Sequence, residues 1–208
     1  MLRTIRREWW PRIPTLRIRS TNRISLDREL AKHFQRLPGG VVLDVGSKAA
    51  PYRELIPHER YMRLDINPAS KPDFCTDLHE FEHEPDSFDA VVALEVLEHL
   101  YAPERAVERL HHVLKPAGVC LLSTRFLYRY HPDPNDYYRF TPDALRYLFR
   151  AFSSVEIYAH GNRVQTIWEM INAGGRSRVV MNLLNPLAAR WRSRDPRFAL
   201  GFVVVAVK

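Results

Sequence analysis

Cysteine, glycine and long apolar runs are all scarce in this chain of 208 residues. Its two cysteines, Cys75 and Cys120, both lie in apolar segments, and we expect buried free thiols of the kind found in a reducing compartment. No run of about eighteen apolar residues occurs, so the sequence predicts no membrane-spanning helix. The N-terminal residues lack the continuous apolar core of a signal peptide. We therefore expect a cytoplasmic protein.

Positive charge is in excess, with a formal net charge of +7, and it is unevenly distributed. The first 38 residues carry ten Arg or Lys against three acids, and residues 161–197 carry seven Arg against two acids. This asymmetry indicates a polyanionic or membrane-surface partner, or only a solvated face. Trp9 and Trp10 lie among these arginines and suit a membrane interface. A peripheral contact with the inner membrane face or a glycolipid is one hypothesis, and a homodimer contact or a lid is the other.

The predicted elements divide the chain into a basic N-terminal arm and helix (1–38) and one domain (39–208). Apolar spacing predicts helices over 26–36, 51–56, 103–115 and from Thr141 onward. Short apolar runs predict strands over 41–45, 60–66, 74–76, 88–94, 119–123, 154–159 and 202–207. The alternation predicts the α/β class, a Rossmann-like, doubly wound, seven-stranded, mostly parallel sheet with helices on both faces. The last strand fits as a hairpin insertion, and 161–197 as a helical lid or interface insertion.

Polar residues follow the first four predicted strands, where a doubly wound sheet binds its ligand. Asp65 follows the second strand about 20 residues after the glycine turn, a spacing that suits an acid holding both hydroxyls of a ribose. Asp77 and Leu78 follow the third strand, where they could contact an adenine. These strand ends favour a nucleoside ligand without phosphate. The candidate residues are Asp44, Gly46, Ser47, Asp65, Ile66, Asp77, Leu78 and Glu95.

The turn after the first strand differs from the dinucleotide fingerprint. A G-x-G-x-x-G motif would need glycine at the positions of Lys48 and Pro51. A nicotinamide or flavin enzyme is therefore disfavoured.

An ordered series of motifs runs from residue 41 to about residue 160. It comprises VLDVGSKAAPY, RLDINP, TDLHEF, SFDAVVALEVLEHL, RLHHVLKPAGVCLLST and HPDPNDYYRFTPDALRYLF. In order and register the series resembles the type 11 branch of class I methyltransferases that depend on S-adenosylmethionine (SAM). The resemblance implies SAM as cofactor, with Asp44 and Gly46 beside its methionine part, Asp65 at the ribose, Asp77 and Leu78 at the adenine, and Glu95 below the sulfonium. Members usually have glycine where this chain has Lys48.

A polar, proline-rich loop follows the fifth strand and would face the sulfonium. An oxygen nucleophile needs a base, and we expect His131 to serve, with Asp133, Asp136 or His99 as alternatives. Tyr137, Tyr138 and Arg139 are expected to contact the substrate, although the loop could also serve only to cap the sheet.

Two carboxylates and an imidazole, Glu95, Glu98 and His99, share one face of a helical turn. They could hold a divalent metal with His131 as a fourth ligand. Because the same letters occur in relatives that need no metal, we predict none.

The sequence therefore predicts SAM-dependent methyl transfer to a small-molecule acceptor, an oxygen of a sugar, glycolipid or natural product. An RNA-directed methyltransferase is the first alternative, motivated by the positive charge. No N-P-P-Y-type base-flipping segment, catalytic cysteine pair or appended RNA module supports it. A catalytically degenerate scaffold that binds a partner through its basic flanks is the second, and Lys48 is the feature that motivates it.

Overall fold

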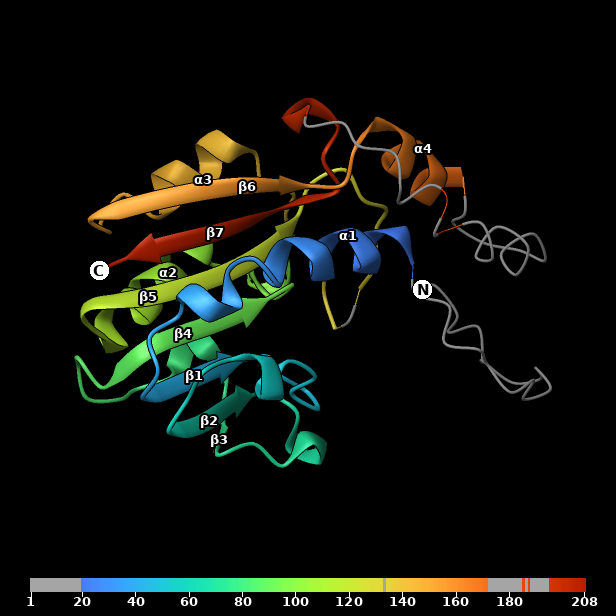
Figure 1. Ribbon diagram of the computed structural model, residues 1–208. Coiled ribbons are helices and arrows are strands. Elements are labelled where there is room, and N and C mark those ends of the chain that lie inside the picture. The colour runs from blue at the N-terminus through green and yellow to red at the C-terminus, as the bar shows by residue number, and fades with distance from the viewer. Residues whose placement is uncertain (1–19, 133, 172–184, 186, 188–194) are drawn as a thin grey trace.

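The computed structural model describes residues 20–132, 134–171, 185, 187 and 195–208 (Figure 1). Its centre is a seven-stranded sheet in the order β3-β2-β1-β4-β5-β7-β6. All neighbouring pairs are parallel except those of β7, which runs antiparallel to both β5 and β6. The predicted α/β class, mostly parallel sheet and closing hairpin insertion are confirmed.

The strands are β1 (Val41–Val45), β2 (Arg60–Asp65), β3 (Phe74–Cys75), β4 (Phe88–Leu94), β5 (Leu114–Arg125), β6 (Ser154–His160) and β7 (Gly201–Val207). The α-helices are α1 (Thr21–Leu30), α2 (Pro103–Val113), α3 (Pro142–Leu148) and α4 (Arg163–Ile171). Short 3₁₀ turns cover Phe34–Arg36, Arg53–Leu55, Pro68–Ser70, Leu78–Glu80, Leu97–His99 and Pro196–Phe198.

Successive residues of a strand point to opposite faces of the sheet, and in this sheet both faces are buried. Val91 and Ala93 of β4 belong to the apolar cluster beneath α2 and α3. Ala90 and Val92 of the same strand belong to the cluster beneath α1, which Figure 1 shows crossing the opposite face. Helices therefore cover both faces, and polar chemistry is displaced to the strand ends.

Two predicted helices differ from the observed ones. The helix expected over 26–36 begins earlier, at Thr21, where the Ser20 hydroxyl accepts a hydrogen bond from the Arg23 N–H (3.1 Å), and α1 ends at Leu30. The segment 51–56 forms only the 3₁₀ turn Arg53–Leu55. Its Ile56 precedes a proline, which disfavours helical backbone at that residue, and adopts an extended conformation.

Helices α2 and α3 begin where the sequence predicted. Pro103 occupies the first turn of α2, and the apolar stripe Ala106, Val107, Leu110 and Val113 is buried. The Thr141 side chain caps α3 by accepting from the Ala144 N–H at 3.2 Å. Strand β5 is longer than predicted, extending to Arg125.

The N-terminal helix and α4 are joined by a buried carboxylate. Oε1 of Glu169 accepts from the Thr21 hydroxyl (2.7 Å) and from the Asn22 N–H (2.8 Å). An anion at this position satisfies the free N–H groups and the positive end of the α1 dipole. Residues 1–19 of the predicted arm, and most of the insertion beyond α4, lie outside the described residues.

The two cysteines differ in environment. Cys120 is buried in β5, and burial raises the pKa of its thiol to about 12. Cys75 is exposed, so the prediction that both thiols are buried was wrong for this residue. Its strand, β3, lies at the edge of the sheet formed by the described strands. Among the described helices, none is both long and apolar enough to span a bilayer.

Gly201 at the start of β7 offers a test of the packing. A Cβ there would lie 2.3 Å from the Thr124 carbonyl oxygen and 2.6 Å from His160 Nε2. Backbone cannot yield as a side chain does, so Gly201→Ala should lower the free energy of unfolding by about 2–3 kcal/mol. Chemical denaturation measures this, with Gly39→Ala as control because nothing lies within 4 Å of its would-be Cβ. Equal stability of the two variants would contradict the observed contact.

Candidate functional site

A cleft of about 200 Å³ opens at the carboxyl ends of β1, β2, β3 and β4. The strand order reverses between β1 and β4, the point at which open α/β sheets bind ligands. Residues from the four strand ends and from the loop 134–137 line this cleft. Six of the predicted cofactor residues are among them: Gly46, Asp65, Ile66, Asp77, Leu78 and Glu95.

The turn after β1 has left-handed backbone at several residues. Gly46 has φ +66°, and a Cβ there would lie 2.6 Å from Val96 Cγ2, so a side chain would enter the floor of the cleft. Lys48 and Ala50 also have positive φ values, +48° and +47°. Non-glycine residues in this conformation cost on the order of 1–3 kcal/mol each. The chain thus keeps a glycine-like backbone at Lys48 despite the strain.

Asp65, at the end of β2, is the best-positioned carboxylate of the cleft. Its Oδ2 accepts from the Lys48 N–H (2.9 Å) and its Oδ1 from the Asn67 N–H (2.8 Å). Each oxygen is fixed by one backbone donor and retains a further lone pair. The group can therefore accept two hydrogen bonds from a neighbouring diol.

Asp77 is held by a residue that the sequence analysis missed. Its Oδ1 lies 2.8 Å from the His79 N–H and 2.6 Å from His79 Nδ1. His79 Nε2 accepts from the Ala102 N–H at 3.3 Å, so Nδ1 carries the proton given to Asp77. The imidazole stacks on Tyr101, with 4.1 Å between ring centroids. His79 and Tyr101 both line the cleft and make its third strand end rigid.

Asp44 and Ser47 are buried and are not among the cleft-lining residues. The Tyr61 hydroxyl donates to Asp44 Oδ2 at 2.6 Å, and burial raises the pKa of Asp44 to about 7. The Ser47 hydroxyl is buried without a hydrogen-bond partner among the described residues. Neither Asp44 nor Ser47 therefore lies at the surface of the cleft.

Arg125, at the end of β5, ties two acids together beside the cleft. Its Nη2 lies 2.7 Å from Glu95 Oε2, and its Nε lies 3.5 Å from Glu98 Oε1. Glu95 has a strained φ of +59°, and Glu98 is fully buried with Oε2 accepting from the Thr124 hydroxyl at 2.9 Å. Burial and the charge of Glu95 raise the pKa of Glu98 to about 8. No sequence pattern pointed to Arg125.

Two histidines, His99 and His131, lie together beside the loop that follows β5. The rings of His99 and His131 are 5.0 Å apart, and only His99 lines the cleft. His99 Nδ1 hydrogen-bonds the Asn135 carbonyl, which can only accept, so Nε2 of neutral His99 carries the lone pair. Burial and the charge of Arg125 lower the pKa of His131 to about 4.

The remaining predicted loop residues divide between structure and cleft. Asp136 accepts from the His131 N–H (2.8 Å) and from Arg139 Nη2 (2.6 Å), and the hydrogen bonds of Arg139 lower the pKa of Asp136. Arg139 also donates to the Tyr128 and Arg129 carbonyls, so this pair braces the loop.

Tyr137 lines the cleft, whereas Tyr138 lies outside it and donates from its hydroxyl to the Tyr101 carbonyl at 3.1 Å. Asp133 lies outside the described residues.

Within the described part of the chain, the structure brings together one set of side chains that could hold a metal ion. Ligand atoms of Glu98, His99 and His131 all lie within 4.8 Å of one another, whereas Glu95 is not in this set. The Arg125 guanidinium already supplies positive charge to Glu98 and would repel a cation at the same place. The electrostatics favour a site without metal, and that remains a prediction.

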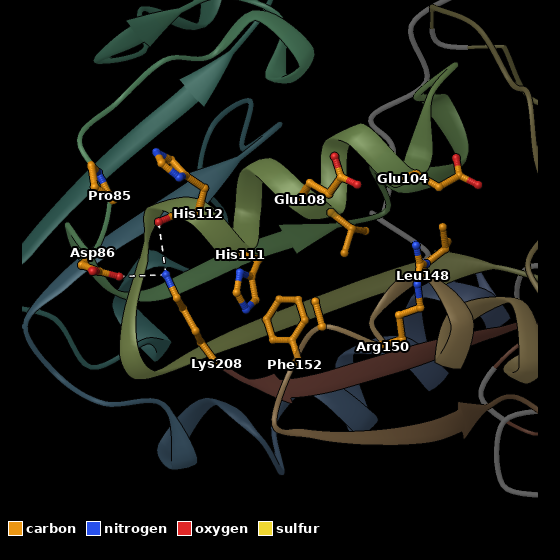
Figure 2. Close-up of a pocket in the computed structure, with 12 residues that line it drawn as sticks. Pro85, Asp86, Glu104, Glu108, His111, His112, Leu148, Arg150, Phe152 and Lys208 are labelled. Carbon is orange, nitrogen blue, oxygen red and sulfur yellow. Dashed lines mark hydrogen bonds and ion pairs between the residues drawn. The ribbon is translucent and has the colours of Figure 1, made fainter.

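A second, larger cavity of about 380 Å³ lies between α2 and the residues that follow α3 (Figure 2). The Lys208 ammonium donates to Asp86 (2.8 Å) and to the Leu114 carbonyl (2.7 Å). The His111 ring packs edge-on against Phe152, with centroids 4.9 Å apart. These groups bond to or pack against neighbouring residues, and none of the predicted site residues lines this cavity.

Comparison with known proteins agrees with this geometry. Residues 43–122 match the family model described as a methyltransferase domain, the type 11 branch, which confirms the resemblance for that part of the chain. A search of the curated proteins found no match.

Solved structures share the fold at low sequence identity. A SAM-dependent methyltransferase from Archaeoglobus fulgidus has 16% identity and a TM-score of 0.60, covering 91% of this chain and 95% of its own. One from Thermotoga maritima has 12% identity and a TM-score of 0.60, covering 90% and 91%. Phosphoethanolamine N-methyltransferase 2 of Haemonchus contortus, crystallised with SAM, has 16% identity and a TM-score of 0.57, covering 86% of this chain and 52% of its own. The chain has the Rossmann-like fold of these methyltransferases.

The buried Asp44 predicts an unusual pH dependence of stability. Its folded pKa, about 7, lies above the ordinary 3.8, so the protonated form is favoured in the fold and the stabilisation is lost as pH rises from about 4 to about 7. Asp44→Asn keeps an acceptor for Tyr61 and should be more stable than the wild type at pH 8 by on the order of 1–3 kcal/mol, with little gain at pH 4. Denaturation in urea at both pH values measures this.

Asp89→Asn is the opposite control. Hydrogen bonds from Lys115 and the Val41 N–H lower the pKa of Asp89, so its stabilisation is present at high pH and lost as pH falls. That variant should therefore lose stability at pH 8 rather than gain it. A pH-independent effect of Asp44→Asn would show that the carboxyl is not titrating in the fold.

Proposed function

We propose that this protein is a SAM-dependent methyltransferase that methylates an oxygen of a small-molecule acceptor. The observation that carries the proposal is the Asp65 carboxylate. One of its oxygens accepts a hydrogen bond from the Lys48 N–H in the turn after β1, and the other accepts from the Asn67 N–H. The methyltransferase family match over 43–122, and a structural neighbour crystallised with SAM, support the choice of cofactor.

The residues of the cleft fit an adenosine attached to an amino acid and carrying no phosphate. Asp65 would hold the ribose hydroxyls, and Asp77 the adenine amino group against the apolar side chains of Ile66 and Leu78. Gly46 leaves room at the floor for the methionine part. SAM, when bound, supplies an electrophilic methyl group on a sulfonium. Glu95, which lines the cleft, would lie below this cation.

The protein's part in the reaction is to align the acceptor and to remove its proton. Positioning of the two reactants is a large share of catalysis in an in-line displacement. His99 faces the cleft with its Nε2 lone pair, held by the bond from Nδ1 to Asn135, and would take the proton of an acceptor hydroxyl. Burial and the charge of Arg125 lower the pKa of His131, which disfavours proton uptake by this residue, and its ring would support that of His99.

The acceptor end of the cleft favours a compact hydroxylated molecule. Pro134, Asn135 and Tyr137 form this end, and they offer an amide together with an aromatic face. A sugar, the head of a glycolipid or a natural product with a ring hydroxyl matches these contacts. The structural neighbours differ in their substrates, so they do not narrow this choice.

Binding of the product S-adenosylhomocysteine tests the cofactor assignment. The wild-type protein should release heat on titration, and Asp65→Ala should weaken binding by about tenfold or more because two hydrogen bonds to the ribose are lost. Asp86→Ala removes a carboxylate remote from the cleft and should bind normally. Absence of heat and of thermal stabilisation in the folded wild type would refute the proposal and favour a degenerate scaffold.

The base assignment is tested by paired histidine variants. His99→Asn retains a donor toward the Asn135 carbonyl but has no basic nitrogen, and should lower kcat by about 10²–10⁴-fold. His131→Asn should lower it far less. The measurement is release of S-adenosylhomocysteine with a panel of sugar and phenolic acceptors, after S-adenosylhomocysteine binding has shown each variant intact. The reverse order of effects would assign the base to His131.

A further inference from the structure

Helix α4 is amphipathic with its polar side turned inward. Gln165, Thr166 and Glu169 are buried, at 2%, 6% and 5% exposure. Ile167, Met170 and Ile171 are exposed, at 53%, 43% and 65%. These three occupy positions i, i+3 and i+4, so they form one continuous outer face. A water-soluble surface helix has the opposite arrangement.

Hydrogen bonds fix the helix in this orientation. The Glu169 carboxylate accepts from Thr21 and Asn22 at the start of α1, and the Thr166 hydroxyl donates to the Phe198 carbonyl at 2.7 Å. Rolling α4 to bury its apolar face would leave these buried polar groups without partners, which is costly. The apolar face is therefore held outward by the fold itself.

The segments that adjoin α1 and α4 in the sequence carry strong positive charge. Residues 1–19 contain six Arg and one Glu and join α1 at the helix end bonded to Glu169, while 172–194 follow α4 directly and contain five Arg and no acid. Together they carry a net +10, so the rest of the chain has a net charge of −3. All four tryptophans, Trp9, Trp10, Trp168 and Trp191, lie in these segments or in α4.

Figure 1 shows α4 and the first turn of α1 at the end of the sheet toward which the arrows of β2 and β4 point. We propose that the outer face of α4, formed by Ile167, Met170 and Ile171, docks on an anionic phospholipid membrane. Aliphatic side chains enter the acyl boundary, tryptophan suits the interface, and arginine is attracted to anionic headgroups. The proposal does not depend on methyl transfer, since it concerns the surface and not the cleft.

Two other occupants fit these features less well. A second copy would meet this face across a two-fold axis, and the dimer would carry the net +10 of the segments that adjoin α1 and α4 twice, which repulsion between like charges opposes. RNA would use the arginines but would leave the aliphatic face of α4 in water, since no base or phosphate needs it. A bilayer surface satisfies the apolar and the charged groups at once.

The binding experiment uses the full chain and large unilamellar vesicles. Co-sedimentation should be strong with mixed phosphatidylcholine–phosphatidylglycerol vesicles and weak with phosphatidylcholine alone, and it should weaken as salt rises. The double variant Ile167→Glu and Ile171→Glu should reduce partitioning onto anionic vesicles by about tenfold or more. Both side chains are exposed, so the variant should fold, and binding of S-adenosylhomocysteine verifies this independently.

Leu55→Glu is the matched control, because Leu55 is also 53% exposed and lies on a different surface. It introduces one negative charge, as the single variant Ile171→Glu does, and it should leave vesicle binding unchanged whereas Ile171→Glu weakens it. Three results would overturn the proposal: no preference for anionic vesicles, equal loss in the control, or dissociation of a dimer by the α4 variant without vesicle binding by the wild type. Tight binding to single-stranded RNA with no vesicle binding would overturn it in favour of a nucleic-acid partner.

Discussion

Burial of the parallel sheet on both faces is the constraint from which the position of the site follows. Ala90, Val91, Val92 and Ala93 leave no polar side chain along the middle of β4, because each face is covered by a helical layer. Polar groups can then lie only where the strands end. Asp65 and Glu95 meet at one edge for this reason, and a ligand bound there contacts several chain segments at once.

A second constraint is the charge that accumulates at that edge. The charge of Glu95 disfavours ionisation of Glu98, and Glu98 has no access to water. Arg125 compensates from the end of β5, while it also lies over the Tyr128 ring at 4.0 Å. Burial and the same guanidinium lower the pKa of His131, so Arg125 stabilises the two acids and also disfavours protonation of one imidazole.

The sequence was sufficient for the sheet and for the strand-end acids, because both depend on local patterns. Continuous β-branched runs identify buried strands, and an acid directly after such a run must lie at the edge. Arg125, His79 and Tyr101 were not predicted, since their roles depend on residues distant in the chain. We expected 161–197 to be helical, and α4 lies in this range, yet a helical apolar pattern is the same whether its apolar face turns inward or outward. Glu169 decides the direction through its contact with Asn22 of α1, which lies 147 residues away in the sequence.

Lys48 shows how a departure from a family pattern can leave the essential geometry intact. The usual glycine provides a backbone with positive φ, and Lys48 adopts φ +48° without it. What the cleft needs from this position is its N–H, and that group donates to Asp65 at 2.9 Å. The hydrogen bond to Asp65 offsets part of the backbone strain at Lys48. The Asn67 N–H holds the other oxygen of the same carboxylate in place. The backbone function of the glycine is thus retained while its side chain is changed, and the departure by itself is no argument for a degenerate site.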